Sequence, residues 1–259
     1  MWTTANKLST RILDCFLWLC SFSILALVVV LMGCSAGLQA PAGTFQASTG
    51  QDFQRGILTR AALVSRYGLY ALDSELPYLR SLKRRLLDGL GRPASFRITV
   101  LKSSQPLAVS AGAGQILLSR GLILSMEREE QLAFVIAHEV GHQILAHIEQ
   151  GRPVRVTDIQ AQELAADKFA AQLMLIVGFS PWNALEALTN FYHLEVGLGT
   201  RFRTSFSAGD QYPDVAKRVS VLQSWLRAGG IMPKRGTVRR EFMRFKSDLR
   251  EGNVGALYG

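Results

Sequence analysis

The chain has little cysteine, little charge and only one long apolar run, and each shortage excludes a class of protein. Three cysteines in 259 residues are too few for a disulfide-dense scaffold. Charged residues make up 19% of the chain and hydrophobic residues 48%, which excludes a disordered chain and leaves ample material for a core. Only residues 15–32 form a run long and apolar enough to span a bilayer, so the sequence does not describe a polytopic membrane protein.

The N-terminal segment has the pattern of a bacterial export signal. Lys7 and Arg11 precede the apolar run, and the tetrapeptide Leu31–Cys34 (Leu-Met-Gly-Cys) closes it. A basic start, an apolar segment and a small residue before a break are typical of a secretory signal. The tetrapeptide resembles a lipobox, in which a peptidase cuts before the cysteine and the thiol carries a lipid.

Cleavage at the lipobox would make residues 1–33 a signal peptide and Cys34 the lipidated first residue of the mature chain. Residues 34–50 are small and polar, which is typical of a tether. Ser35 after the cysteine resembles the pattern of lipoproteins sent on to the outer membrane. We therefore expect a lipid-anchored protein of the cell envelope that faces the periplasm, at the outer membrane rather than the inner. The alternative is an uncleaved transmembrane anchor, because the apolar run is nearly long enough to cross a bilayer.

Residues 51–259 have the periodicity of one mainly helical domain with a small sheet, an α+β fold. Stretches rich in β-formers predict strands at 95–101, 107–111 and 115–119. Apolar residues at helical spacing predict the remaining elements. The expected helices are 52–90 with breaks at Gly68 and Pro77, 125–147 capped by Ser125, 157–177 opened by a capping box at Thr157, one from Pro181, 213–226, and 237–250. We expect the last helix to pack on the domain rather than on a membrane.

Residues 138–142 read His-Glu-Val-Gly-His, the H-E-x-x-H pattern of zinc proteases. Histidines four residues apart lie on one face of a helix, so the imidazoles of His138 and His142 can bind one ion. Glu139 points about a quarter-turn away, where it can hold a water molecule rather than the ion. The surrounding helix is apolar on all sides, and burying these groups without partners would cost on the order of several kcal/mol. The alternative is a pair of core histidines bonded to backbone carbonyls.

A catalytic zinc site needs a third protein ligand and leaves one position to water. The next predicted helix carries Glu163 and Asp167 on one face. Glu163 can bind the ion, while Asp167 can accept a hydrogen bond from the outer nitrogen of a ligating histidine. The alternative is a solvated acidic face.

The order H-E-x-x-H then E-x-x-x-D resembles that of the gluzincins. The stretches SAGAGQILLSRGLI and LAFVIAHEVGHQILAHIE look like those of zinc peptidases of the HtpX-like and CAAX prenyl protease group, which includes bacterial lipoprotein members. The resemblance covers roughly residues 108–226. It implies a zincin-like domain in which His138, His142 and Glu163 bind one Zn²⁺ per chain and Glu139 is the catalytic base.

The same resemblance marks one departure and one further histidine. The group usually carries His-Pro followed by Arg near the zinc, whereas this chain has Tyr212-Pro213 and retains Arg218. Tyr212 or Arg218 could donate a hydrogen bond to a developing oxyanion, or Pro213 and Arg218 could only position a helix. His147 matches a histidine of the group, for which we expect a structural, hydrogen-bonding role.

These patterns predict a zinc metalloendopeptidase that hydrolyses peptide bonds in envelope proteins, with a possible part in quality control. Its partners would be protein or peptide substrates, held as an extra strand near residues 107–112, and the membrane through Cys34. The net charge is +9, but no pattern of arginine and aromatic residues suggests nucleic acid. The alternatives are a non-proteolytic zinc lipoprotein with a chaperone or assembly role, and a small-molecule hydrolase. The presence of Glu139 argues against a purely structural zinc site.

Overall fold

The computed structural model describes residues 50–71, 75–91, 94–147, 156–198, 215–234 and 239–253, without the side chains of 51, 52, 156, 157 and 191–198. All of them belong to the compact unit 40–259, and the other unit, 1–39, lies outside this description. The fold is α+β and mostly helical, as the sequence predicts. The described strands are β1 Arg97–Leu101, β2 Ala108–Gly112 and β3 Gln115–Ser119. The described helices are α2 Gly50–Tyr67, α3 Pro77–Asp88, α4 Arg120–Ser125, α5 Glu129–Ile144, α6 Val156–Ile176, α7 Trp182–Leu198, α8 Val215–Ala228 and α9 Arg240–Glu251.

The sheet has the order β1-β3-β2, so β2 lies at one edge of the described strands. β1 pairs with β3 in parallel, and β2 pairs with β3 as an antiparallel hairpin. Ala113 and Gly114 between them both have positive φ, as a type I′ hairpin turn requires. A bulge shifts the register between Ser110 and Gly112, so the end of β2 departs from regular pairing.

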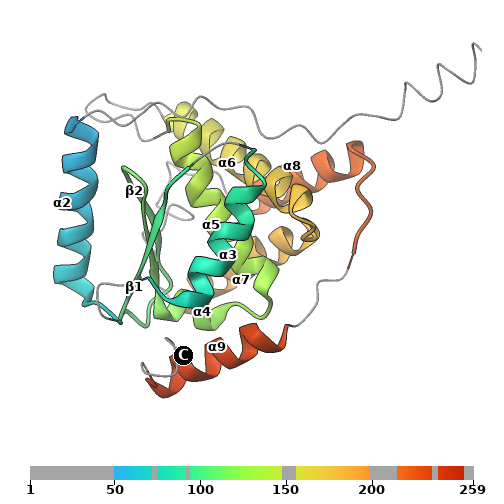
Figure 1. The fold of residues 1–259 in the computed structure, drawn as a ribbon. Helices are drawn as coiled ribbons and strands as arrows, with labels where there is room; N and C mark the ends of the chain where they lie inside the picture. Colours follow the sequence, from blue (N-terminus) through green and yellow to red (C-terminus); the bar gives the residue numbers. More distant parts are fainter. Residues whose placement is uncertain are drawn as a thin grey trace, which may run out of the picture. The chain divides into compact units, whose positions relative to one another are not determined.

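The sheet lies between α2 on one face and α5 with its neighbouring helices on the other (Figure 1). Leu63, Val64 and Tyr67 of α2 pack on a small cluster that consists of Leu101, Ala111 and Leu117 of the strands and of Leu107, which directly precedes β2. Residues of the opposite strand face join the main core that surrounds α5. Gly56 of α2 lies so close to the hairpin that an added Cβ would stand 2.8 Å from the carbonyl oxygen of Gly112. These contacts fix β2 beside the most buried helix of the domain.

Helix α5 is central: every residue from Glu129 to Ile144 except Gln143 is buried. α3, α6 and α7 surround it (Figure 1). Ala166 and Phe169 of α6 pack against Gly141 of α5, where an added Cβ would lie 3.0 Å from the ring of Phe169. Small residues at this crossing bring the two helices close together.

Four details of the predicted helices are wrong. Ser125 does not cap α5, because it ends α4, a short helix that the sequence did not predict and that Ser119 caps. Instead Gln131 of α5 accepts a hydrogen bond from the backbone N–H of Glu127, 2.7 Å away. Helix α5 ends at Ile144 rather than near His147, and Thr157 lies inside α6 rather than at its cap.

The C-terminal helix α9 packs on the domain, which confirms the sequence prediction. Phe242, Phe245 and Leu249 are buried, and the rings of Phe245 and Tyr78 stack with centroids 4.5 Å apart. The N–H groups of Lys246 donate to the carbonyl oxygen of Met126. Among the helices of the described ranges, none combines the length and hydropathy needed to cross a membrane.

Candidate metal centre

Three ligand-type side chains from two helices converge at the centre of the domain. His138 and His142 stand one turn apart on α5, with 2.9 Å between their Nε2 atoms. Glu163 of α6 faces both, with its carboxylate oxygens 3.4 Å from Nε2 of His138 and 3.3 Å from Nε2 of His142. All three are buried. The structure therefore brings together the three residues that the spacing of the motifs singles out.

The donor set fits a divalent metal ion. One atom from each residue lies within 4.8 Å of the other two, and two imidazole nitrogens with one carboxylate oxygen are the ligands of many catalytic zinc sites. Glu139, next to His138, is fully buried, and neither of its carboxylate oxygens has a hydrogen-bond partner among the described residues. Buried polar atoms are normally satisfied, so this group could bind a metal ion with a water molecule beside Glu139.

Asp167 orients the first histidine. Its Oδ1 lies 3.0 Å from Nδ1 of His138, on the side of the ring opposite to Glu163. A carboxylate at the outer nitrogen fixes the tautomer of a ligating histidine and raises its basicity. Asp167 is one turn after Glu163 on α6, so one helix face supplies both carboxylates.

Arg218 of α8 binds Asp167 and lies close to Glu163. Its Nε and Nη2 donate to the two oxygens of Asp167 at 2.8 and 2.6 Å, and its Nη1 lies 3.4 Å from Glu163. The side chain is fully buried. Each guanidinium nitrogen therefore faces a carboxylate, which favours a positioning role for Arg218 over direct contact with a developing oxyanion.

The charges of this group shift one another's pKa values. Burial lowers the pKa of His138, but the carboxylates of Asp167 and Glu163 outweigh it and raise the pKa to about 9. Burial raises the pKa of Asp167, but the Arg218 guanidinium and His138 hold it below its usual range. The pKa of Glu163 is likewise lowered, because the two histidines overcome the effect of burial. Without a metal ion the cluster thus favours ionised carboxylates and a protonated His138.

Glu139 and His147 complete the surroundings. Burial raises the pKa of Glu139, against the opposing effect of His138 and His142. His147 follows the end of α5, where Ala146 turns the chain with φ of 56°. Its Nδ1 lies 3.2 Å from Nδ1 of His142, and burial with the neighbouring histidines lowers its pKa to about 4. A neutral His147 can therefore accept a hydrogen bond from His142, consistent with the structural role expected of it.

Some predicted site residues lie outside the described part of the chain. These are Tyr212 and Cys34. Conversely, Ser110 of β2 contacts the backbone of Glu139, and Gln143 of α5 bonds to Ser110, although the sequence pattern singled out neither residue. Ser110 Oγ donates to the carbonyl oxygen of Glu139 at 3.0 Å. The position of Gln143 four residues after Glu139 was the available signal, because such residues share a helix face.

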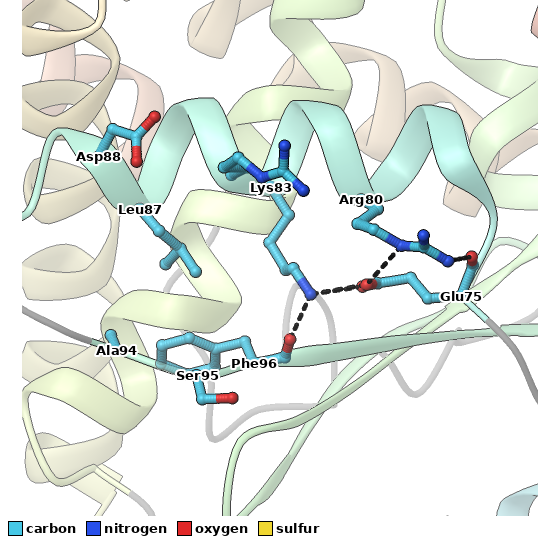
Figure 2. Close-up of a pocket in the computed structure, with 9 residues that line it drawn as sticks. Glu75, Arg80, Lys83, Leu87, Asp88, Ala94, Ser95 and Phe96 are labelled. Carbon is cyan, nitrogen blue, oxygen red and sulfur yellow. Dashed lines mark hydrogen bonds and ion pairs between the residues drawn. The ribbon is translucent and has the colours of Figure 1, made fainter.

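A cavity of about 380 Å³ lies elsewhere, between α3 and the segment leading into β1. Figure 2 shows Lys83 reaching from α3 to Glu75 and to the carbonyl oxygen of Phe96. The Nζ of Lys83 is 2.7 and 2.8 Å from the two oxygens of Glu75. The most buried cation of this cavity is thus neutralised, and none of the candidate metal ligands lines it. We assign no ligand to it.

Comparison with known proteins agrees with this centre. A search of curated proteins returns no match to the chain. A scan against family models matches residues 73–155 to Peptidase family M48. The matched segment contains the sheet and α5 with His138, Glu139 and His142, and it ends before α6. The similarity to Peptidase family M48 is therefore confined to the part of the chain that carries the sheet and the two histidines.

Proposed function

We propose that the protein is a zinc-dependent metalloendopeptidase that hydrolyses peptide bonds in proteins of the bacterial cell envelope. The observation that carries this proposal is the convergence of His138, His142 and Glu163 beside a buried Glu139 whose carboxylate has no described hydrogen-bond partner. A site that served only to hold an ion would not need a carboxylate next to a ligand in this position. The family match supports the peptidase class.

His138, His142 and Glu163 would hold the ion, and the donor set suits zinc. When bound, such an ion acts as a Lewis acid that polarises a peptide carbonyl and lowers the pKa of a water molecule towards neutrality. Asp167 and His147 hold the outer nitrogens of the two histidines, so that each Nε2 presents its lone pair to the centre. Arg218 balances the negative charge of the two α6 carboxylates.

Glu139 would act as general base and then as general acid. It takes a proton from the attacking water and transfers this proton to the amine that leaves. Its burial raises its pKa, which favours a carboxylate that accepts a proton readily. We infer that Arg218 acts on this reaction through Asp167 and Glu163 rather than by touching the substrate, and that Tyr212 remains the candidate donor to the oxyanion.

The edge strand β2 would hold the substrate backbone. β2 lies at the edge of the described sheet, and its Ser110 contacts the backbone of Glu139. An extended peptide that adds to a sheet edge gains backbone hydrogen bonds without requiring particular side chains. A peptide along β2 would therefore pass beside Glu139. The location at the envelope rests on the lipobox ending in Cys34, and lipidation is tested by the mass of the N-terminal peptide.

Cleavage of casein by the purified full-length chain tests the proposed activity. We expect hydrolysis that a chelator abolishes and that added zinc restores. Replacing Glu139 by Gln keeps the size of the side chain but removes the base, so turnover should fall about 10²- to 10⁴-fold while bound metal is retained. Casein cleavage that survives in Glu139→Gln at the wild-type rate would refute the assignment. Binding of unfolded protein without cleavage would instead favour the non-proteolytic chaperone.

A further inference from the structure

Gln143 ties the active-site helix to the edge hairpin. It is the one residue of α5 that is not buried, and it lies on the same helix face as Glu139. Its Oε1 accepts a hydrogen bond from the N–H of Gly114 at 2.7 Å. Its Nε2 donates to Ser110 Oγ at 2.8 Å and to the carbonyl oxygen of Gln115 at 3.2 Å. One carboxamide thus binds both strands and the turn between them.

Ser110 continues this connection to the candidate base. Its hydroxyl accepts from Gln143 and donates its single proton to the carbonyl oxygen of Glu139. Both hydrogen-bonding roles of the hydroxyl are therefore used, and both link β2 to α5. The neighbour on the same strand face, Ala108, is buried in the main core, so a polar residue at 110 interrupts an otherwise apolar face.

The end of β2 that Gln143 and Ser110 link to α5 is also the part of the strand whose register regular pairing fixes least. The bulge falls between Ser110 and Gly112, and Gly112, Ala113 and Gly114 all have positive φ. A bulge leaves one residue out of the ladder, and glycine-rich strand ends are prone to alternative registers. The hydrogen bonds of Gln143 lie on both sides of this segment, so they hold the irregular end of the hairpin at one position along α5.

We propose that Gln143 and Ser110 form a clamp that sets the register of a bound peptide relative to Glu139. This inference rests on the proposed peptidase function and on β2 as the strand that pairs with the substrate. Both are positioning residues, since they act through the β2 backbone. The clamp thereby decides which peptide bond lies beside Glu139, which makes it a determinant of the cleavage position.

A shift in the position of the bound peptide should change the reaction rate measurably. A slip of one residue moves a strand by about 3.3 Å, whereas a displacement of about 1 Å can cost about 10²-fold in rate. A loosened hairpin would therefore present neighbouring bonds to Glu139 and hold none of them as well. Loss of the clamp should change the cleaved bond and lower kcat, and the metal content should be unchanged because no ligand is altered.

The test compares Ser110→Ala with Ser110→Thr in the full-length, zinc-loaded chain. The substrate is a peptide that the wild type cuts at one dominant bond, and mass spectrometry maps the products. Ser110→Ala removes both hydrogen bonds, so we expect cleavage at an adjacent bond and a fall in kcat of about 10-fold or more. Ser110→Thr keeps the hydroxyl and should restore the wild-type bond. Ser125→Ala, which removes a hydroxyl bonded to Leu122 in α4, is the control and should behave as wild type.

A second variant guards against loss of folding. Gln143→Glu keeps the acceptor for Gly114 but cannot donate to Ser110, and it should also shift the cleaved bond. If Ser110→Ala and Gln143→Glu both cut the wild-type bond with the wild-type kcat, the clamp is refuted. A wild-type chain that binds zinc but cuts no peptide would refute the proposed function instead, so the two failures are distinguishable.

Discussion

Replacing Asp167 by Asn separates the charge of this residue from its shape. Asn can still accept a hydrogen bond from Nδ1 of His138, which lies 3.0 Å from Oδ1 in the native chain, but it no longer carries the negative charge. Changes of such outer partners cost about 10- to 100-fold in metal affinity, or about 1.4–2.8 kcal/mol. The change also removes the carboxylate that pairs with the buried Arg218, whereas Glu163 stays 3.4 Å from this guanidinium.

The pH of the measurement matters. The native carboxylates raise the pKa of His138 to about 9, so at neutral pH a proton competes with the metal ion for this ring. In the Asp167→Asn variant His138 would hold that proton less tightly, which offsets part of the lost affinity. The deficit in metal affinity of this variant should therefore be largest near pH 9 and smaller at pH 7. A competitive chelator titration at both pH values measures it.

Unfolding in urea gives an independent measure. Removing one partner of a buried ion pair costs about 3–5 kcal/mol, and we expect the lower end of this range because Glu163 still faces Arg218. Asp158→Asn is the control, because it makes the same chemical change at an exposed position in the first turn of the same helix. Its unfolding free energy should fall by less than about 1 kcal/mol. Equal metal affinity and equal unfolding free energy in Asp167→Asn and wild type would refute the role given to this carboxylate.

Three further predictions concern the same centre. Arg218→Lys keeps the positive charge but loses the paired hydrogen bonds to Asp167, so the unfolding free energy in urea should fall by about 2–4 kcal/mol, and an unchanged value would contradict the bidentate contact. Gly141→Ala places a methyl group against the ring of Phe169. Its unfolding free energy should fall by about 1 kcal/mol, because overpacking exceeds the gain in helix propensity. Weaker metal binding should accompany this fall. A more stable variant with native metal affinity would argue against close contact between the two helices. Metal uptake near pH 7 should release about one proton from His138, and calorimetry in buffers of different ionisation enthalpy would reveal it; no release would contradict the raised pKa.

Local periodicity accounts for what the sequence predicted well. The three strands, the breaks at Gly68 and Pro77, and the helices carrying the two motifs follow from spacing and turn residues. The grouping of His138, His142 and Glu163 also follows from positions one turn apart on each of two helices. For the strands, the breaks and the histidine pair, the deciding interactions lie within a few residues of one another, whereas Glu163 joins the histidines from the next predicted helix.

The features that the sequence missed depend on contacts between distant segments. Helix α4 contains Gly121, where an added Cβ would collide with the carbonyl oxygen of Ser104, so packing rather than helix propensity selects this residue. The true start of α5 uses the side chain of Gln131, not a serine. Whether Arg218 faces a substrate or two carboxylates depends on how α8 packs against α6, which spacing along the chain does not specify.

X-ray absorption spectroscopy of the zinc-loaded, full-length protein tests the coordination most directly. The expected spectrum contains two imidazole nitrogens and carboxylate or water oxygens at about 2.0–2.2 Å, with one zinc per chain and a large loss of zinc in Glu163→Ala. A scatterer at the zinc–sulfur distance of about 2.3 Å, or a spectrum unchanged by Glu163→Ala, would contradict this account.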